Sequence, residues 1–301
     1  MTTSLSYLPI TANWKTIAWN GTVFCTVAGS GTTAATSTNG VDWIARTLPQ
    51  NQNWVGIAWN GSVFCAISAS RSIALSSNGS TWSLHSLPVT VTYAETIISF
   101  NGLFIVNCTY VGIYTSSDGI NWTTNNSLSG LYFTSFGCND SIVIAKEGTN
   151  LYTSTNGINW TSQYAYPLGG GYQYAWNGTI FCSTSGSFGN KYITSTDGIT
   201  WIERTFPSAQ TWNGIIWNGT VFCVIAYNST AALTSVDGIN WTSRTLPAIA
   251  KWTRMIWNGT IMCAISGTDN KVATSTDGTW QDYELNPAFW TNFKGQTELL
   301  V

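Results

Sequence analysis

The sequence predicts an all-β fold, a seven-bladed β-propeller with four antiparallel strands in each blade. Three observations predict this fold. Two motifs recur in fixed phase along the 301 residues, apolar and polar residues alternate within each repeat, and no segment has the period of an amphipathic helix. Four short strands in each repeat of about 40 residues are typical of propeller blades, which surround a central axis.

The first motif is Ser-x-(Asp/Asn)-Gly followed by Trp, and it occurs seven times with spacings of 39, 40, 38, 41, 40 and 40 residues. Its serines are Ser37, Ser76, Ser116, Ser154, Ser195, Ser235 and Ser275. The second motif is Trp-Asn-Gly-(Thr/Ser)-(Val/Ile)-(Phe/Met)-Cys. It begins at Trp19, Trp59, Trp176, Trp217 and Trp257, and the third and fourth repeats carry degraded copies.

Each repeat is interpreted as strands A to D, and the first repeat shows the reasons. Asn20-Gly21 predicts a tight turn between strands A and B, because both residue types tolerate positive φ. The Ser-x-Asn-Gly segment predicts the turn between strands C and D, and Pro49 is expected to end strand D. The expected elements are strand A at 14–19, strand B at 22–28, strand C near 33–36, the turn at 37–40 and strand D at 42–48.

The propeller is expected to span residues 1–285, and residues 286–301 fit no repeat and form a C-terminal extension. The repeats lie near 11–50, 51–89, 90–129, 130–168, 169–208, 209–248 and 249–285. Residues 4–9 resemble the end of a strand D. We therefore expect this N-terminal segment to pair with the last repeat and close the ring, which removes an exposed sheet edge.

The seven Ser-x-(Asp/Asn)-Gly-x-x-Trp segments resemble the Asp-box (BNR-like) repeats of sialidase-like propellers, in a form one residue shorter between the Asp and the Gly. Arrays that combine this box with Trp-Asn-Gly are similar to those of phage tail and other microbial surface proteins. The resemblance implies a propeller with boxes at the C–D turns, opposite the usual binding face. Sialidase activity is not expected, because the chain lacks an Arg-Ile-Pro segment and has few arginines outside the repeat.

The composition excludes several classes of protein. Only 8% of residues are charged, against about 25% in an average domain, and the net charge is −2. Clustered cations for nucleic acid are therefore absent, and no apolar run is long enough for a membrane helix. We expect no cofactor and no metal site, because the seven cysteines lack zinc-type spacing and five of them occupy one strand B position. Without a recognisable signal peptide, we expect a virion or extracellular surface location, with a cytoplasmic one as the alternative.

An aromatic column supplies the candidate binding residues. Aromatic side chains recur near the start of strand A, and they are Trp14, Trp54, Tyr93, Tyr132, Tyr172, Trp212 and Trp252. A ring of exposed aromatics would stack on the C–H faces of sugars, whereas buried ones would fill the space between blades. Both interpretations stay open on the sequence. The polar candidates beside this ring are Glu95, Glu147, Asp269 and Arg71.

The leading functional hypothesis is a non-enzymatic, lectin-like module that binds a glycan or a glycosylated receptor. The first alternative is a structural or protein-docking propeller in a virion or surface assembly. The second is a degenerate glycosidase that uses Glu95 and Glu147, which requires their carboxyl groups to lie about 5–9.5 Å apart.

Overall fold

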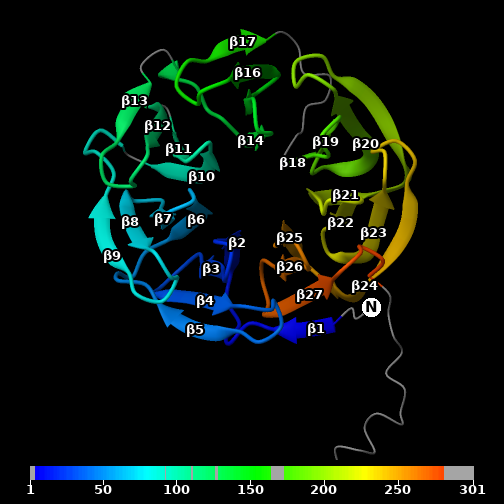
Figure 1. Cartoon of the computed structure of the whole chain (residues 1–301), viewed down its shortest axis with the longest axis horizontal. Helices are drawn as coiled ribbons and strands as arrows, with labels where there is room; N and C mark the ends of the chain where they lie inside the picture. Colours follow the sequence, from blue (N-terminus) through cyan, green and yellow to red (C-terminus); the bar gives the residue numbers. More distant parts are fainter. Residues whose placement is uncertain (1–3, 92, 110, 126–127, 164–172, 281–301) are drawn as a thin grey trace, which may run out of the picture.

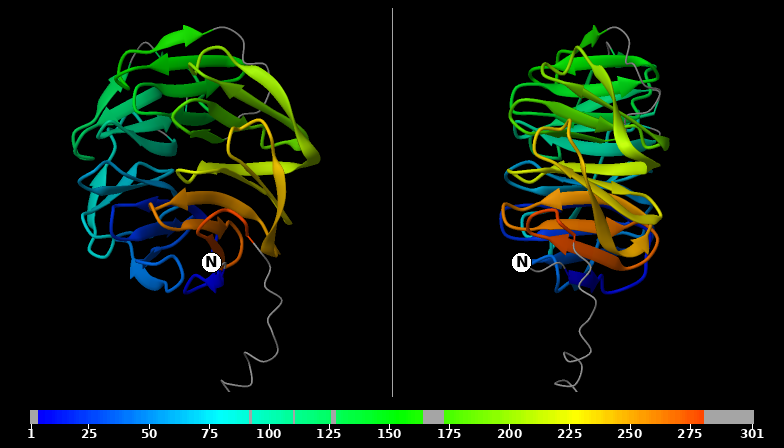
Figure 2. Two further views of the ribbon diagram at one scale, coloured as in Figure 1. Left: turned by 45° about the vertical axis from the view of Figure 1, so that its right-hand side comes forward. Right: turned by 90° about the vertical axis from the view of Figure 1, so that its right-hand side faces the viewer.

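The structure, a computed structural model, describes residues 4–91, 93–109, 111–125, 128–163 and 173–280, and its sheets are arranged in a ring around a central axis (Figure 1). Side views show that the ring is a flattened disc whose sheets stand side by side (Figure 2). The fold is therefore a β-propeller, as the sequence predicts.

The strands follow the repeats of the sequence. Those of the first two repeats are β2 (Trp14–Trp19), β3 (Phe24–Ala28), β4 (Thr33–Ser37), β5 (Ile44–Thr47), β6 (Trp54–Trp59), β7 (Phe64–Ser68), β8 (Ser72–Ser76) and β9 (Ser83–Ser86). Those of the third and fourth are β10 (Ala94–Phe100), β11 (Leu103–Cys108), β12 (Gly112–Ser116), β13 (Thr123–Asn125), β14 (Ser135–Cys138), β15 (Val143–Glu147), β16 (Asn150–Ser154) and β17 (Thr161–Gln163).

The remaining repeats contain two long strands. Their strands are β18 (Gln173–Trp176), β19 (Phe181–Thr184), β20 (Phe188–Ser195), β21 (Ile202–Trp217), β22 (Phe222–Ala226), β23 (Ser229–Ser235), β24 (Thr242–Ala250), β25 (Trp252–Trp257), β26 (Met262–Ser266) and β27 (Lys271–Ser275). β21 is strand D of the fifth repeat and strand A of the sixth, so the two repeats share one seven-stranded sheet.

Two prolines lie inside strands rather than at their ends. Pro207 falls within β21 and Pro247 within β24, whereas β5 ends before Pro49 as expected. In both long strands the proline sits where the register of the ladder shifts, between the pairs Lys191–Thr205 and Gly189–Gln210 in the first case. The ladder of hydrogen bonds is interrupted at such a bulge, so the partner strand does not require the N–H group that proline lacks.

The N-terminal strand closes the ring. β1 (Ser4–Tyr7) pairs antiparallel with β27, with Ser4 opposite Thr274 and Tyr7 opposite Lys271. The sheet order is β1-β27-β26-β25, so the first strand of the chain is the outermost strand of the last repeat. Figure 1 shows β1 beside β27 at the seam. The expected closure is confirmed.

The connections lie at two opposite ends of the sheets. The B–C and D–A connections meet at one end, which we call the loop face; the Gly29 amide, for example, donates to the Asn13 carbonyl oxygen. The A–B turns and the box turns meet at the other end, which we call the turn face, where Asn60 Nδ2 donates to the Ser117 carbonyl oxygen at 2.8 Å. The Ser-x-(Asp/Asn)-Gly segments are thus the turns between strands C and D, as the sequence predicts.

The core lies between neighbouring sheets. The strand B cysteines Cys25, Cys65, Cys182, Cys223 and Cys263 are free and buried, as expected for small apolar residues in this position. Box glycines of the next repeat pack against this layer. A Cβ on Gly79 would lie 2.9 Å from Thr36 Cγ2, and one on Gly238 only 2.6 Å from Cys182 Sγ. The glycines therefore permit close approach of the sheets in addition to their positive φ.

Candidate functional site

The box turns satisfy their own hydrogen bonds. In the third repeat, the Gly119 amide donates to Ser116 Oγ at 2.9 Å, and the amides of Ile120 and Asn121 donate to Asp118 Oδ1 at 2.8 Å. Trp122 Nε1 donates to the Gly119 carbonyl oxygen at 3.0 Å. The boxes are therefore structural turns, in agreement with the sequence-based interpretation. Asparagine replaces aspartate in three boxes and accepts the same backbone bonds.

The last box differs because it is one residue short. Trp280 Nε1 donates to Cys223 Sγ at 2.7 Å rather than to a box carbonyl, and its φ of 40° lies in the left-handed region. This indole is fully buried against the sixth repeat. The shortened turn thus redirects the tryptophan into the core between the last two sheets.

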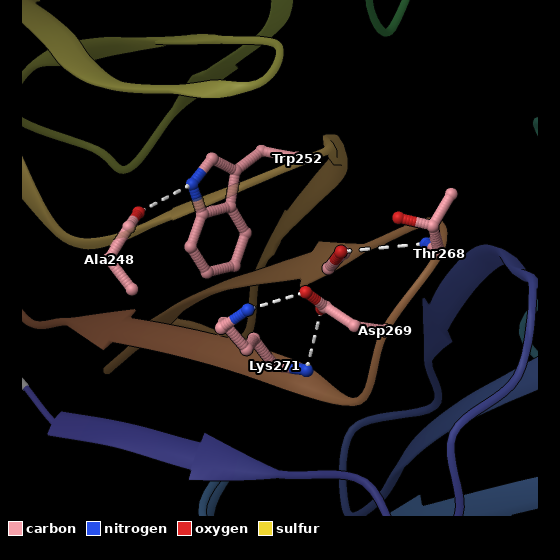
Figure 3. Close-up of polar contacts among 6 residues, drawn as sticks. Ala248, Trp252, Thr268, Asp269 and Lys271 are labelled. Atoms are coloured by element: carbon pink, nitrogen blue, oxygen red, sulfur yellow. Dashed lines mark hydrogen bonds and ion pairs between the residues drawn. The ribbon is translucent and has the colours of Figure 1, made fainter.

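The four candidate tryptophans are buried, so of the two interpretations that the sequence left open, these four residues follow the one in which they fill the space between blades. Trp14, Trp54, Trp212 and Trp252 are each at most 1% exposed. The indole nitrogens of the last three donate to carbonyl oxygens of preceding D–A or B–C connections. Figure 3 shows this bond for Trp252, which donates to the Ala248 carbonyl oxygen at 3.2 Å. Strand A starts where neighbouring sheets converge, and a large flat side chain fills the gap between them.

The tyrosines differ from the tryptophans. Tyr93 and Tyr132 lie in D–A connections on the loop face and are 45% and 40% exposed. Tyr172 lies outside the described residues. The structural register explains the difference in the third repeat: Ala94 pairs with Cys108 as Trp14 pairs with Ala28, so Ala94 occupies the tryptophan position and Tyr93 precedes it.

Three of the polar candidates have local roles on the loop face. Asp269 forms an ion pair with Lys271 at 2.6 Å and accepts the Lys271 amide at 3.1 Å (Figure 3). Burial raises the pKa of its carboxyl, but the hydrogen bonds from Lys271 and Ser266 outweigh burial and leave the pKa below its usual value. Glu147 accepts from Asn150 Nδ2 at 3.3 Å. Arg71 has a φ of 80°, and its carbonyl oxygen accepts the Leu87 amide in the D–A connection.

Glu95 lies elsewhere, in a polar cavity of about 270 Å³ on the propeller axis. Its Oε1 accepts from Thr109 Oγ1 at 2.7 Å. Glu147 does not line this cavity, because it ends β15, a second strand from the axis, whereas Glu95 is on the innermost strand. The structure therefore does not bring the two glutamates into one cleft as the glycosidase hypothesis requires.

The cavity is lined by one column of the repeat that the sequence did not single out. The equivalent residues, each two positions after the tryptophan position, are Thr16, Gly56, Thr96, Ser135, Gln173, Gly214 and Arg254. All but Gly214 line the cavity. These residues are small or polar. In the sequence the column can be recognised because each member lies five residues before the Asn-Gly glycine or its equivalent. The third repeat is an exception, because β10 is longer.

A side chain of this region joins the inner strands of the fifth and seventh repeats, β18 and β25, across the sixth. The Thr253 carbonyl oxygen accepts from Gln173 Nε2 at 3.0 Å and from Arg254 Nη1 at 2.9 Å. Gly214 carries no side chain between the two, and a Cβ there would meet Ile225 at 2.9 Å. Burial lowers the pKa of the Arg254 guanidinium from its usual value. The cavity thus contains one cation and one anion, Arg254 and Glu95, among its described lining residues.

The structure gives two further observations about other site types. Across the described residues, no group of three or more His, Cys, Asp and Glu side chains is placed to hold a metal ion. The same part of the chain contains no helix long and apolar enough to cross a membrane.

No family model and no curated protein sequence matches the chain. Solved structures are similar in fold, and three examples cover 91% of this chain. Virginiamycin B lyase from Staphylococcus aureus has a TM-score of 0.76 at 12% identity over 99% of its chain. YCF48 bound to D1 peptide has a TM-score of 0.72 at 15% identity over 94% of its chain. The Swd1 propeller domain of Myceliophteria thermophila has a TM-score of 0.67 at 8% identity over 99% of its chain. Since identities this low establish architecture and nothing further, the conclusion they support is that the chain has the β-propeller fold.

Proposed function

We propose that the chain is a non-enzymatic binding module that docks a partner protein on its loop face. The observation that carries the proposal is the contrast between the two faces. The turn face repeats one box geometry, whereas the D–A connections of the loop face vary, from residues 48–53 after β5 to β21, which runs without a break from strand D into strand A. Variable connections on a rigid scaffold are where binding residues concentrate.

The loop face exposes large apolar side chains from several connections. They are Ile10, Val89, Tyr93, Tyr132, Phe188, Tyr227 and Ile249. The most exposed are Val89 at 86% and Phe188 at 77%. Aromatic and large aliphatic side chains are the residues that a protein partner buries at the centre of an interface.

The low charge of the chain favours the same role. Only 8% of all residues are charged, so docking on this face desolvates few ions. YCF48, which has the same fold, has been solved with a D1 peptide bound, which makes a polypeptide a reasonable ligand class to test first. Burial of the four candidate tryptophans removes the main argument for a sugar.

The test is a peptide-display selection against the folded protein, followed by binding assays with paired variants. Val89→Arg combined with Ile249→Arg places two cations on the loop face, and Ile158→Arg is the control on the turn face, where Ile158 is 50% exposed. We expect selected peptides to lose at least about tenfold in affinity for the loop-face variant and to bind the control unchanged. Peptides that respond only to Ile158→Arg would contradict the proposal.

A glycan is the second candidate ligand, since Tyr93 and Tyr132 keep exposed rings on the loop face. A virion or microbial surface location would suit a glycan-binding role. Binding on a glycan array that is lost in both Tyr93→Ala and Tyr132→Ala would favour this candidate over protein docking. Retention of the binding in both variants would argue against it.

A further inference from the structure

The central cavity carries opposite charges on opposite walls. Arg254 belongs to the seventh repeat and Glu95 to the third, and each lies on the innermost strand. Two repeats separate them on one side of the ring and three on the other, so they face the axis from nearly opposite directions. The ion pairs of the described residues are Lys191–Glu203 and Lys271–Asp269, and neither includes Arg254 or Glu95. The two charges are therefore not paired with each other.

Arg254 has unused hydrogen-bonding capacity. A guanidinium has five N–H donors, and the hydrogen bond that Arg254 makes to the described residues is the one from Nη1 to the Thr253 carbonyl oxygen. The side chain is partly buried, and no ion pair of the described residues includes it, so the guanidinium is available to an anion that enters the cavity. A carboxylate is the planar group that a guanidinium binds best.

Glu95 has the complementary property. One of its oxygens accepts from Thr109 Oγ1, and the described residues supply the carboxylate with no other hydrogen-bond donor. The rest of the wall is uncharged and mixes polar residues with the apolar Val55, Ile97, Ile98, Phe133 and Phe136. Thr16, Thr96 and Ser135 are among its polar residues, and Ser135 Oγ is buried without a partner. Such a cavity would hold a ligand that is neutral overall and charged at each end.

The size of the cavity restricts the ligand further. At about 270 Å³ it lies below the range of about 300–1,000 Å³ that is usual for drug-sized ligands. Gln173 donates to the Thr253 carbonyl oxygen beside Arg254, and both side chains line the cavity. A molecule with few atoms and two charged ends fits these limits.

We propose that the central cavity binds a small zwitterion of the size of a free amino acid, with its carboxylate on Arg254 and its ammonium group on Glu95. This site is independent of protein docking on the loop face. Gln173 and the uncharged wall residues, such as Ile97 and Phe136, contact the uncharged part of the ligand. Arg254 therefore acts as a ligand-binding residue rather than as part of the core.

The test is titration calorimetry of the full chain with unbranched ω-amino acids of increasing length, from glycine through β-alanine to γ-aminobutyrate, whose charged groups lie at opposite ends of the molecule. Acetate and methylammonium serve as half-ligands. The variants are Arg254→Met, Arg254→Lys and Glu95→Gln, and Lys251→Met is the control because Lys251 does not line the cavity. We expect saturable binding of at least one amino acid, weakened about tenfold or more by Arg254→Met and by Glu95→Gln but unchanged by Lys251→Met.

The thermal midpoint separates binding from folding. Without ligand, Arg254→Met is expected to unfold at the wild-type temperature or above, because a partly buried charge without an ion-pair partner is removed. If this variant does not fold, Arg254→Lys and Glu95→Gln still decide the outcome. The absence of binding by every amino acid at about 10 mM, or binding that survives Arg254→Met, would overturn the proposal. Acetate binding as tight as that of the best amino acid would also overturn it.

Discussion

At the scale of single residues, the same aromatic column holds two kinds of side chain. The tryptophans are locked between sheets by packing and by indole hydrogen bonds to connection carbonyls, as Trp54 is to Gly31. The tyrosines one position away, such as Tyr93, extend from the loop face instead. A single position in the register thus separates a core residue from one that can contact a partner.

This difference predicts opposite outcomes for two aromatic truncations. Trp54→Ala should lower the free energy of unfolding by about 3–5 kcal/mol, because it leaves a cavity and an unpaired carbonyl. Tyr93→Ala should change it by no more than about 0.5 kcal/mol, because the ring is half exposed. Chemical denaturation of both variants checks the prediction. Equal effects would mean that Trp54 is not part of the core.

The boxes predict a pH dependence that belongs to their aspartates. The backbone amides of Asn121 and Ile120, which donate to Asp118, hold the pKa of that carboxyl well below its usual value. On acidification, this carboxyl therefore takes up a proton in the unfolded chain before it does so in the folded protein. The stability that ionised Asp118 contributes to the fold is present above about pH 4 and is lost as the pH falls toward the pKa of the folded state.

Asp118→Asn tests the sign of this effect, since Asn156 makes the same backbone bonds in the next box. We expect the variant to match the wild type within about 0.5 kcal/mol at pH 7 and to lose less stability on acidification. Thermal midpoints measured from neutral pH to about pH 2 provide the comparison. A variant with a steeper acid dependence than the wild type would contradict the assignment.

At the scale of elements, closure of the ring rests on β1. The Leu8 amide donates to the Asn270 carbonyl oxygen, and its side chain is 1% exposed in a cluster with Trp14 and Val272. This cluster joins the first and the last repeats across the seam. The seam is therefore a packed interface as well as a hydrogen-bonded one.

One leucine and one isoleucine truncation near β1 test whether packing at the seam stabilises the ring. Leu8→Ala is expected to destabilise the fold by about 2–5 kcal/mol, because it opens a cavity at the seam. Ile10 lies two residues away and is 45% exposed, so Ile10→Ala should change the free energy of unfolding by about 0.5 kcal/mol or less. Denaturant midpoints, with gel filtration to detect association through an opened edge, measure both. A small effect of Leu8→Ala would show that the ring does not depend on this contact.

At the scale of the whole molecule, the fold is held together by apolar packing and backbone ladders with little contribution from ions. The described residues contain two ion pairs, Lys191–Glu203 and Lys271–Asp269, and the side chains of both pairs are partly exposed. Exposed pairs contribute about 0–1 kcal/mol each.

The thermal midpoint should therefore hardly change between about 0.05 and 0.5 M NaCl, because salt screens only charge interactions. Differential scanning calorimetry at the two concentrations measures it. A large decrease with salt would show that charges contribute more to the fold than two exposed pairs can. The Lys191→Met variant serves as a control, since it removes one pair and should leave the salt response unchanged.

The sequence by itself determined the architecture of this protein. The box and Trp-Asn-Gly motifs recur with a constant period, and this period predicted the strand order and the pairing of residues 4–7 with the last repeat. Local turn chemistry predicted that the box turns lie at one face. The tertiary structure decided which members of a column face water. Sheets converge toward the axis, so the strand A tryptophans are buried, while Arg254 and Glu95 reach one cavity from repeats far apart in the chain. That convergence is set by how the whole ring closes, and no single repeat encodes it.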